Sequence, residues 1–250
     1  MRRPQAFSLA FPRGQGGSGN GASYGIGFAI ATALAEAGAK IAFNDRRQER
    51  IDSATAEYAK RGIVAHGFVA DVTVEEQVAG LIEDIRKVYG TTPDILVNNA
   101  GIIKRIPMLE MSAADYRQVV DIDLVGPFIC AKAVIPGMIE KGHGKIINIC
   151  SMMSELGRET IAGYAAAKGG LKMLTKNICS EFGEANIQCN GIGPGYIATR
   201  RPLPCVSASR TARATRSTSS SVPRRPLAAG ARPRTSWDRQ SSSPLTPRTS

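Results

Sequence analysis

Hydrophobic and polar positions along residues 21–199 follow a repeating order of short apolar runs and longer amphipathic segments. Buried strands are predicted by the apolar runs over 41–43, 64–70, 95–97, 145–150 and 187–192. Helices are predicted by apolar residues at helical spacing within 28–37, 48–61, 78–88, 116–139 and 160–182. Strands that are apolar throughout and alternate with helices indicate a parallel sheet covered on both faces. We therefore expect a single-domain α/β fold with a doubly wound parallel sheet.

The two ends of the chain break this pattern. Residues 14–20 are rich in glycine and stand where a first strand should precede the first helix, but nothing in them favours a strand. After Thr199 all periodicity stops, and arginine, serine and proline dominate as in disordered segments. The pattern therefore divides the chain into an aberrant segment over 1–20, a folded domain over 21–199 and an aberrant tail over 200–250.

The net charge of +11 is concentrated in the tail. Residues 200–250 hold eleven arginines and one acidic residue, Asp238, so they account for +10 of the total. The remainder is electrically balanced, which argues against a nucleic-acid partner for the folded domain. A basic arm that binds nucleic acid is the alternative for the tail alone.

Cysteines, histidines and the N-terminus exclude several further classes of protein. The five cysteines are scattered without a Cys-x-x-Cys pair, and His66 and His143 lack ligand spacing, so we expect neither a disulfide framework nor a metal site. No apolar run approaches the roughly 20 residues of a membrane span. The first residues lack the apolar core of a signal peptide. A cytoplasmic protein without a membrane contact is expected.

A glycine-rich turn opens the first predicted helix, and glycines there let the backbone approach a pyrophosphate at the helix N-terminus. Asp45 ends the next strand, 18 residues after Gly27, where a carboxylate binds both ribose hydroxyls and favours NAD. Arg46 is placed to meet the 2′-phosphate of NADP instead, so NAD is favoured and NADP stays open. Asp71 and Val72 end the third strand, either as adenine contacts or with Asp71 as a helix N-cap. The turn contributes Gly21, Ser23, Tyr24, Gly25, Ile26 and Gly27 to this Rossmann-type cofactor site.

A phenol and an ammonium group share one helical face at Tyr164 and Lys168. Ser151 closes a buried strand thirteen residues before Tyr164, at the sheet edge where substrate should bind. Two further segments follow neighbouring strands at the same edge: the Asn-Asn-Ala-Gly run of residues 98–101 and the Gly-Pro-Gly run that starts at residue 193. The chain therefore gathers hydroxyl, phenol and ammonium groups beside a cofactor turn.

In order and spacing, these motifs resemble those of the short-chain dehydrogenase/reductase family over residues 21–199. The resemblance implies hydride transfer between NAD(P) and a secondary alcohol or ketone. It implies that Tyr164 takes the alcohol proton, that Ser151 hydrogen-bonds the reacting oxygen, and that Lys168 stabilises the Tyr164 phenolate and holds the nicotinamide ribose. Further cofactor contacts implied are Asn98, Ala100, Gly101, Pro194, Gly195, Ile197 and Thr199.

Asp123 departs from the family pattern, because members often carry asparagine there as part of a proton relay. A carboxylate accepts hydrogen bonds from water but cannot donate one as an amide does, which leaves the role of Asp123 in catalysis open.

The segments 150–160, 169–175 and 186–192 resemble the gluconate 5-dehydrogenase branch of the family, which implies interconversion of D-gluconate and 5-keto-D-gluconate. Arg158 is the first candidate to bind the substrate carboxylate, and Arg105, with Lys104, is the second. A 3-oxoacyl reductase, a polyol dehydrogenase and an inactive remnant are the alternatives. Relatives commonly form tetramers, so the resemblance implies a homotetramer for the intact form.

Both ends of the chain are compatible with a shifted reading frame. Codons for residues 15–20, read one base later, permit Lys-Val-Ala-Leu-Val-Thr, an ordinary first strand, and codons for residues 223–250 permit segments that resemble the family's C-terminal part. We therefore expect single-base changes before Gly21 and near Thr199. Because a lost central strand leaves ladder groups unpaired, the chain as written should fold poorly and show little activity.

Overall fold

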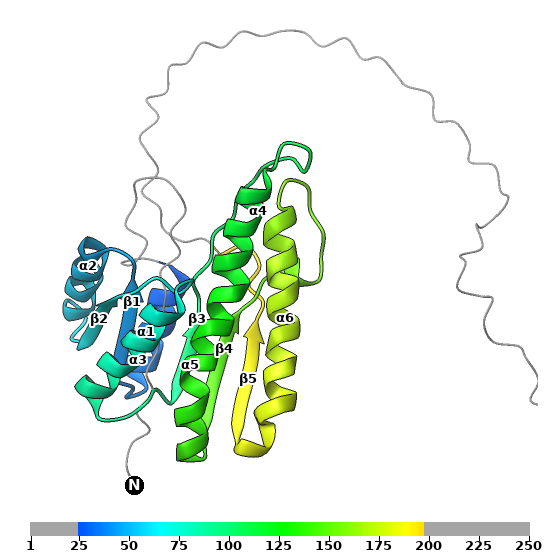
Figure 1. Ribbon diagram of the computed structural model, residues 1–250. Helices are drawn as coiled ribbons and strands as arrows, with labels where there is room; N and C mark the ends of the chain where they lie inside the picture. The colour runs from blue at the N-terminus through cyan, green and yellow to red at the C-terminus, as the bar shows by residue number, and fades with distance from the viewer. Residues whose placement is uncertain (1–24, 198–250) are drawn as a thin grey trace, which may run out of the picture. The chain divides into compact units, whose positions relative to one another are not determined.

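A computed structural model describes residues 25–197 of the 250-residue chain (Figure 1). By internal contacts the chain divides into two units, Met1–Pro202 and Leu203–Ser250, and the second lies wholly outside the described residues. The predictions for the first strand, for the tail and for Gly21, Ser23, Tyr24 and Thr199 also fall outside them.

Every strand and helix predicted within residues 25–197 is present, with ends displaced by a few residues at most. The first half contains α1 (Ile26–Glu36), β1 (Ile41–Asp45), α2 (Gln48–Ala59), β2 (Ala65–Val69), α3 (Glu75–Tyr89) and β3 (Ile95–Asn98). The second half contains α4 (Ala113–Val120), η1 (Asp121–Val125), α5 (Gly126–Lys141), β4 (Gly144–Ile149), η2 (Met152–Ser154), α6 (Ala162–Phe182), η3 (Gly183–Ala185) and β5 (Ile187–Ile192). The alternation of strands and helices is that of an α/β Rossmann-type fold.

The long helix predicted over 116–139 consists of three joined segments. Between α4 and α5, the turn η1 has π-helical geometry, which is frequent at functional sites. The continuous span Ala113–Lys141 is long and apolar enough to cross a membrane by length and composition, although it holds no unbroken apolar run of about 20 residues. Its most apolar window is 56% buried inside the protein, as in a core helix.

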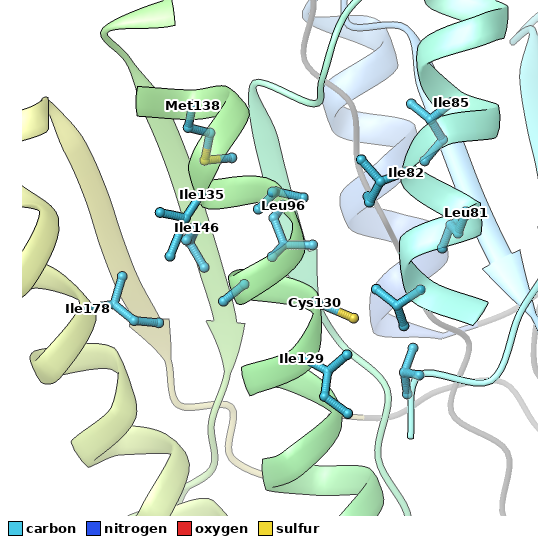
Figure 2. Close-up of a cluster of buried hydrophobic side chains, with 14 of the residues drawn as sticks. Leu81, Ile82, Ile85, Leu96, Ile129, Cys130, Ile135, Met138, Ile146 and Ile178 are labelled. Carbon is cyan, nitrogen blue, oxygen red and sulfur yellow. The ribbon is translucent and has the colours of Figure 1, made fainter. Parts of the chain in front are cut away.

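Alternating side chains of β1 divide the hydrophobic core into two faces. Ile41 and Phe43 pack with Phe28 of α1 and with α2 in one buried cluster. Ala42 between them points to the opposite cluster, which is built from α3, α5 and α6. Figure 2 shows this second cluster, where Leu96 of β3 lies among side chains of α5 and β4. Helices therefore cover both faces of the parallel strands, as the apolar pattern predicted.

The five described strands form two parallel sheets. β1 pairs with β2, while β3, β4 and β5 pair in that order, all in parallel register. β2 pairs with one edge of β1, and β4 pairs with one edge of β3. Within residues 25–197, no strand pairs with the other edge of β1 or of β3. A strand that precedes α1 and crosses right-handedly into β1 would lie next to β1.

Candidate active site

The carboxyl end of β4 presents Ser151 at the edge of the sheet. Ser151 is the N-cap of η2, and its Oγ accepts a hydrogen bond from the backbone N–H of Met153 at 3.1 Å. In return, the backbone N–H of Ser151 donates to Oγ of Ser154 at 3.2 Å. This capping box fixes the backbone of Ser151 where the polypeptide leaves the sheet.

Helix α6 places Tyr164 and Lys168 one turn apart and directs both into the protein. Lys168 is fully buried, and its Nζ donates to the backbone carbonyl of Ile149 at 2.8 Å. The same Nζ lies 5.7 Å from the centroid of the Tyr164 ring. The ammonium group is thus anchored to the last residue of β4, within electrostatic range of the phenol.

Asp123, from η1, completes the charged group beneath Tyr164. Its Oδ2 lies 3.3 Å from Nζ of Lys168, and its Oδ1 accepts the backbone N–H of Ile102 at 2.7 Å. Asp123 therefore ties the buried lysine to the loop that follows β3. The sequence singled out Asp123 but not Ile102, because a backbone N–H carries no side-chain signal.

The ring of Tyr164 sits in a small apolar cluster. Val119 and Ile161 are buried against it, and Met153 packs beside them together with Ile102 and Ile103. This lining keeps water from one side of the phenol and strengthens the field of the nearby charges. Met153 packs in this cluster, whereas the neighbouring Met152 is about half exposed.

A pocket of about 470 Å³, open to solvent, lies at the carboxyl ends of β1 and β2. Ala70, Val72 and Ile122 supply flat apolar walls, and Asp45 lies at the end of β1. The pocket also includes Asn44, Arg46, Arg50, Asp71, Ala100, Gly101 and Ile102. Its position and its mixture of apolar walls and charged groups fit the adenosine half of a dinucleotide.

The charged side chains of this pocket are arranged in two pairs. Arg46 lies 3.5 Å from Asp71, and Arg50 lies 3.7 Å from Asp45. Burial alone would raise the pKa of Asp71, but hydrogen bonds from Thr73 and the charge of Arg46 hold that pKa below its usual value. The N-cap of α3 is Val74, so Asp71 does not fill the capping role that was its alternative.

Two glycines on the described part of the cofactor path have a specific structural requirement. Gly25 caps α1 with φ +125°, a conformation that side-chain-bearing residues rarely adopt. A Cβ atom at Gly101 would lie 2.7 Å from Oδ2 of Asp123. Ile26 and Gly27 begin α1 directly after the turn. The positive φ at Gly25 therefore requires glycine at the start of α1, and the close contact with Asp123 requires glycine at position 101.

The loop after β5 lies against Ser151, as the family order predicted. The backbone N–H of Met152 donates to the carbonyl of Pro194 at 3.4 Å. Gly195 has open space where a Cβ would stand, and Ile197 is largely exposed. These predicted cofactor residues therefore reach the edge that carries Ser151.

Arg158 and Arg105, the candidates for a substrate carboxylate, have different surroundings. Nη1 of Arg158 donates to the Tyr196 hydroxyl, and its guanidinium lies 5.9 Å from that ring's centroid. Tyr196 belongs to the loop that contacts η2 beside Ser151, which places Arg158 at this edge of the sheet. Arg105 is exposed, and the neighbouring Lys104 is bound to Asp115 at 2.6 Å.

The sequence did not identify Arg50 as a site residue. Arg50 follows Asp45 by five residues in the first turn of α2, and only the fold brings its guanidinium back to that carboxylate. Asn98 was predicted as a cofactor contact, but its amide donates to Asn148 at 2.8 Å and to the Pro127 carbonyl at 3.4 Å. Its Oδ1 is buried without a hydrogen-bond partner among the described residues, so the cofactor contact of Asn98 stays a prediction, as do those of Ala100 and Gly101.

Two features of the site are typical of dinucleotide-dependent oxidoreductases. They are the pocket at the carboxyl ends of a parallel sheet and the buried lysine beside a tyrosine. Residues 20–203 match the short chain dehydrogenase family model, and the chain belongs to this family. It is an NAD(P)-dependent oxidoreductase that acts on CH–OH groups.

Two dehydrogenases of known sequence illustrate what this chain is similar to. The 2-dehydro-3-deoxy-D-gluconate 5-dehydrogenase of Formosa agariphila is 55% identical over 185 residues, which cover 74% of this chain and 70% of that protein. The gluconate 5-dehydrogenase of Gluconobacter oxydans is 41% identical over 199 residues, which cover 80% and 76%.

Two solved structures share the fold. A 2-keto-3-deoxy-D-gluconate dehydrogenase from Streptococcus agalactiae has 65% identity and a TM-score of 0.64, covering 78% of this chain and 70% of that one. A gluconate 5-dehydrogenase from Burkholderia cenocepacia, in complex with NADP and tartrate, has 41% identity and a TM-score of 0.69, covering 77% and 72%.

Proposed function

We propose that the site oxidises the C5 hydroxyl of D-gluconate to 5-keto-D-gluconate and catalyses the reverse reduction with NAD or NADP. The observation that carries the proposal is that buried Lys168, beside Tyr164, is anchored to the last residue of β4, the strand that Ser151 follows. The gluconate 5-dehydrogenases among the similar proteins support the substrate.

Each side chain has one chemical role in this proposal. Tyr164 as phenolate accepts the proton of the alcohol, and Ser151 hydrogen-bonds the reacting oxygen. Lys168 stabilises the phenolate by its charge, and Asp123 holds Lys168 in place. A bound nicotinamide would supply the acceptor for the hydride that leaves C5 of the alcohol. The alcohol thus loses two electrons and two hydrogens and becomes a ketone.

The cofactor would be held along the path from Gly25 to Gly101. Asp45 and Arg46 would contact the adenosine ribose, and Asp71 and Val72 would contact the adenine, since all four line the pocket. Arg158 would bind the C1 carboxylate of the substrate with its planar pair of N–H donors. Arg158 contacts Tyr196 on the loop after β5, and Pro194 of that loop contacts Met152 next to Ser151, so a substrate anchored at C1 by Arg158 would extend its C5 toward Ser151.

A second candidate substrate is 2-dehydro-3-deoxy-D-gluconate, which also carries a C1 carboxylate and a C5 hydroxyl. The observation that favours it is the 55% and 65% identity to proteins named for this substrate. A polyol lacks the carboxylate, and an acyl thioester replaces it with a bulky leaving group. Arg158 would recognise neither of them by charge.

The test is a comparison of kcat/KM for D-gluconate, 2-dehydro-3-deoxy-D-gluconate, xylitol and a 3-oxoacyl thioester, with NAD and with NADP. The proposal expects the two sugar acids to exceed the other substrates by at least tenfold. A polyol or thioester that outpaces both acids would reject it. No turnover with any substrate would favour an inactive remnant.

We also propose a homotetramer in the cytoplasm for the intact form. Val125, Phe128 and Ile139 of the η1–α5 segment expose apolar side chains, which supports self-association through this segment. Light scattering of the purified protein measures the mass, and cell fractionation measures the location.

A further inference from the structure

Asp45 is the residue from which an NAD preference was expected, yet its carboxylate is not an isolated charge. Its side chain is only 5% exposed, and Arg50, itself 13% exposed, places Nη1 3.7 Å from its Oδ2. Its Oδ1 accepts the backbone N–H of Arg47 at 3.0 Å. Both carboxylate oxygens therefore already interact with groups of the α2 N-terminus.

The pairing changes the electrostatics of the ribose end of the pocket. An uncompensated carboxylate would repel the two negative charges of a 2′-phosphate, and burial would strengthen that repulsion. Arg50 cancels the charge of Asp45, and Arg46 does the same for Asp71 at 3.5 Å. The four side chains together are electrically neutral, and Arg46 is half exposed.

We propose that Arg50 sets the cofactor choice by acting through Asp45: it removes the repulsion that would otherwise exclude a 2′-phosphate, so the pocket accepts NADP as well as NAD. Arg50 is a positioning residue in this proposal, because it touches the carboxylate and not the nucleotide. The inference deepens the proposed function and rests on dinucleotide binding in this pocket.

The experiment measures the binding of adenosine 2′,5′-bisphosphate and adenosine 5′-monophosphate by titration calorimetry. It uses the full chain as written and, in parallel, the full chain with Lys-Val-Ala-Leu-Val-Thr at residues 15–20. In Arg50→Gln we expect the bisphosphate to bind at least tenfold more weakly, while the monophosphate changes less than twofold. Lys60→Gln removes one charge at the opposite end of α2, about 15 Å away along the helix, and should change neither affinity.

The double variant Asp45→Asn with Arg50→Gln separates this role from two others. If Arg50 acts through Asp45, removing the carboxylate restores bisphosphate binding to within threefold of the unaltered chain. If the double variant stays as weak as Arg50→Gln, Arg50 contacts the phosphate directly and the inference is wrong. If Arg50→Gln weakens both ligands equally, Arg50 is only structural and the inference is also wrong.

Failure of the proposed function has a separate signature. In that case neither adenosine ligand would bind the unaltered chain, in either form, and the nucleotide pocket itself would be refuted together with the role of Arg50. Binding of the monophosphate alone would leave the pocket intact and overturn only the inference.

Discussion

Asp123 and Lys168 form a fully buried ion pair, with Oδ2 of the carboxylate 3.3 Å from Nζ of the lysine. Buried charges are costly unless they are paired and hydrogen-bonded. Here the backbone groups of Ile102 and Ile149 supply the additional hydrogen bonds. The pair therefore links α6, β4, η1 and the loop after β3 at one point beneath Tyr164.

The first prediction concerns the coupling energy of this pair. Asp123→Asn or Lys168→Met alone should lower the free energy of unfolding by about 3–5 kcal/mol, because each leaves one buried charge unpaired. The double variant should lose much less than the sum of the two single losses. Urea unfolding of all four proteins, each carrying Lys-Val-Ala-Leu-Val-Thr at residues 15–20 so that unfolding is cooperative, gives the coupling energy.

The control for this cycle is the exposed pair Asp84–Lys87 on α3, which lies 2.8 Å apart. Surface pairs contribute about 0–1 kcal/mol, so Asp84→Asn and Lys87→Met should add with little coupling. A coupling for Asp123–Lys168 no larger than that of the surface pair would contradict the prediction.

The second prediction concerns the general base. Tyr164→Phe should lower kcat by about 10²–10⁴-fold, because the ring still packs but no longer accepts a proton. Nucleotide binding and the melting temperature should change little. Tyr116→Phe, on α4, removes a hydroxyl that has no role in the chemistry and serves as the matched control. Unaltered kcat in Tyr164→Phe would rule out this tyrosine as the base.

The third prediction concerns substrate charge. Arg158→Met should raise KM for D-gluconate by at least about tenfold, since a charge-assisted carboxylate interaction contributes roughly 1.5–3 kcal/mol. Any turnover of an uncharged polyol should change much less. Arg105→Met provides the comparison, because Arg105 was the second candidate. A larger effect at Arg105 than at Arg158 would reverse the assignment of the anchor.

The fourth prediction is a pH dependence at Asp71. Because its folded-state pKa is lowered, its contribution to stability is present above the unfolded pKa of about 3.9 and is lost as pH falls through the folded-state value. Asp71→Asn keeps an acceptor for Thr73 but loses the charge facing Arg46. The difference in melting temperature between the unaltered chain and Asp71→Asn should therefore become smaller as the pH falls from about 5 to about 3. A gap independent of pH would show that the charge contributes nothing.

Sequence periodicity predicted the helices and strands but not the turn that joins α4 to α5. Apolar runs located β1 and β3 because strands buried on both faces are apolar throughout. Periodicity did not predict the π-helical turn η1, because its residues continue the helical pattern of α4 and α5. Motif spacing located Tyr164 and Lys168, because one helical turn fixes their separation.

Contacts that depend on tertiary packing could not be predicted from the sequence. The pairing of Arg50 with Asp45 requires the turn from β1 into α2, which no local pattern specifies. The contacts of Asp123 are a second case, because its partners Lys168 and Ile102 come from two other parts of the chain. Contacts between side chains could be predicted from the sequence only where the residues belong to a known motif.

The last prediction concerns the division of the sheet between β1 and β3. Replacing residues 15–20 with Lys-Val-Ala-Leu-Val-Thr should supply a strand for the two edges that have no neighbour within residues 25–197. Each added ladder hydrogen bond contributes about 0.5–1.5 kcal/mol, and each buried valine or leucine about 1.5–3 kcal/mol. Against a usual total of about 5–15 kcal/mol, that gain should convert a weakly folded chain into one that unfolds cooperatively.

Thermal unfolding followed by circular dichroism, together with turnover of D-gluconate, measures this effect. The replacement should raise the melting temperature and the turnover number, and correction of the frame after Thr199 should raise turnover further. As the control, the same replacement with its leucine changed to proline removes a ladder donor from a central strand and should cancel the gain. If the chain as written unfolds as cooperatively and turns over as fast as the replaced one, no strand is missing and the shifted frame is refuted.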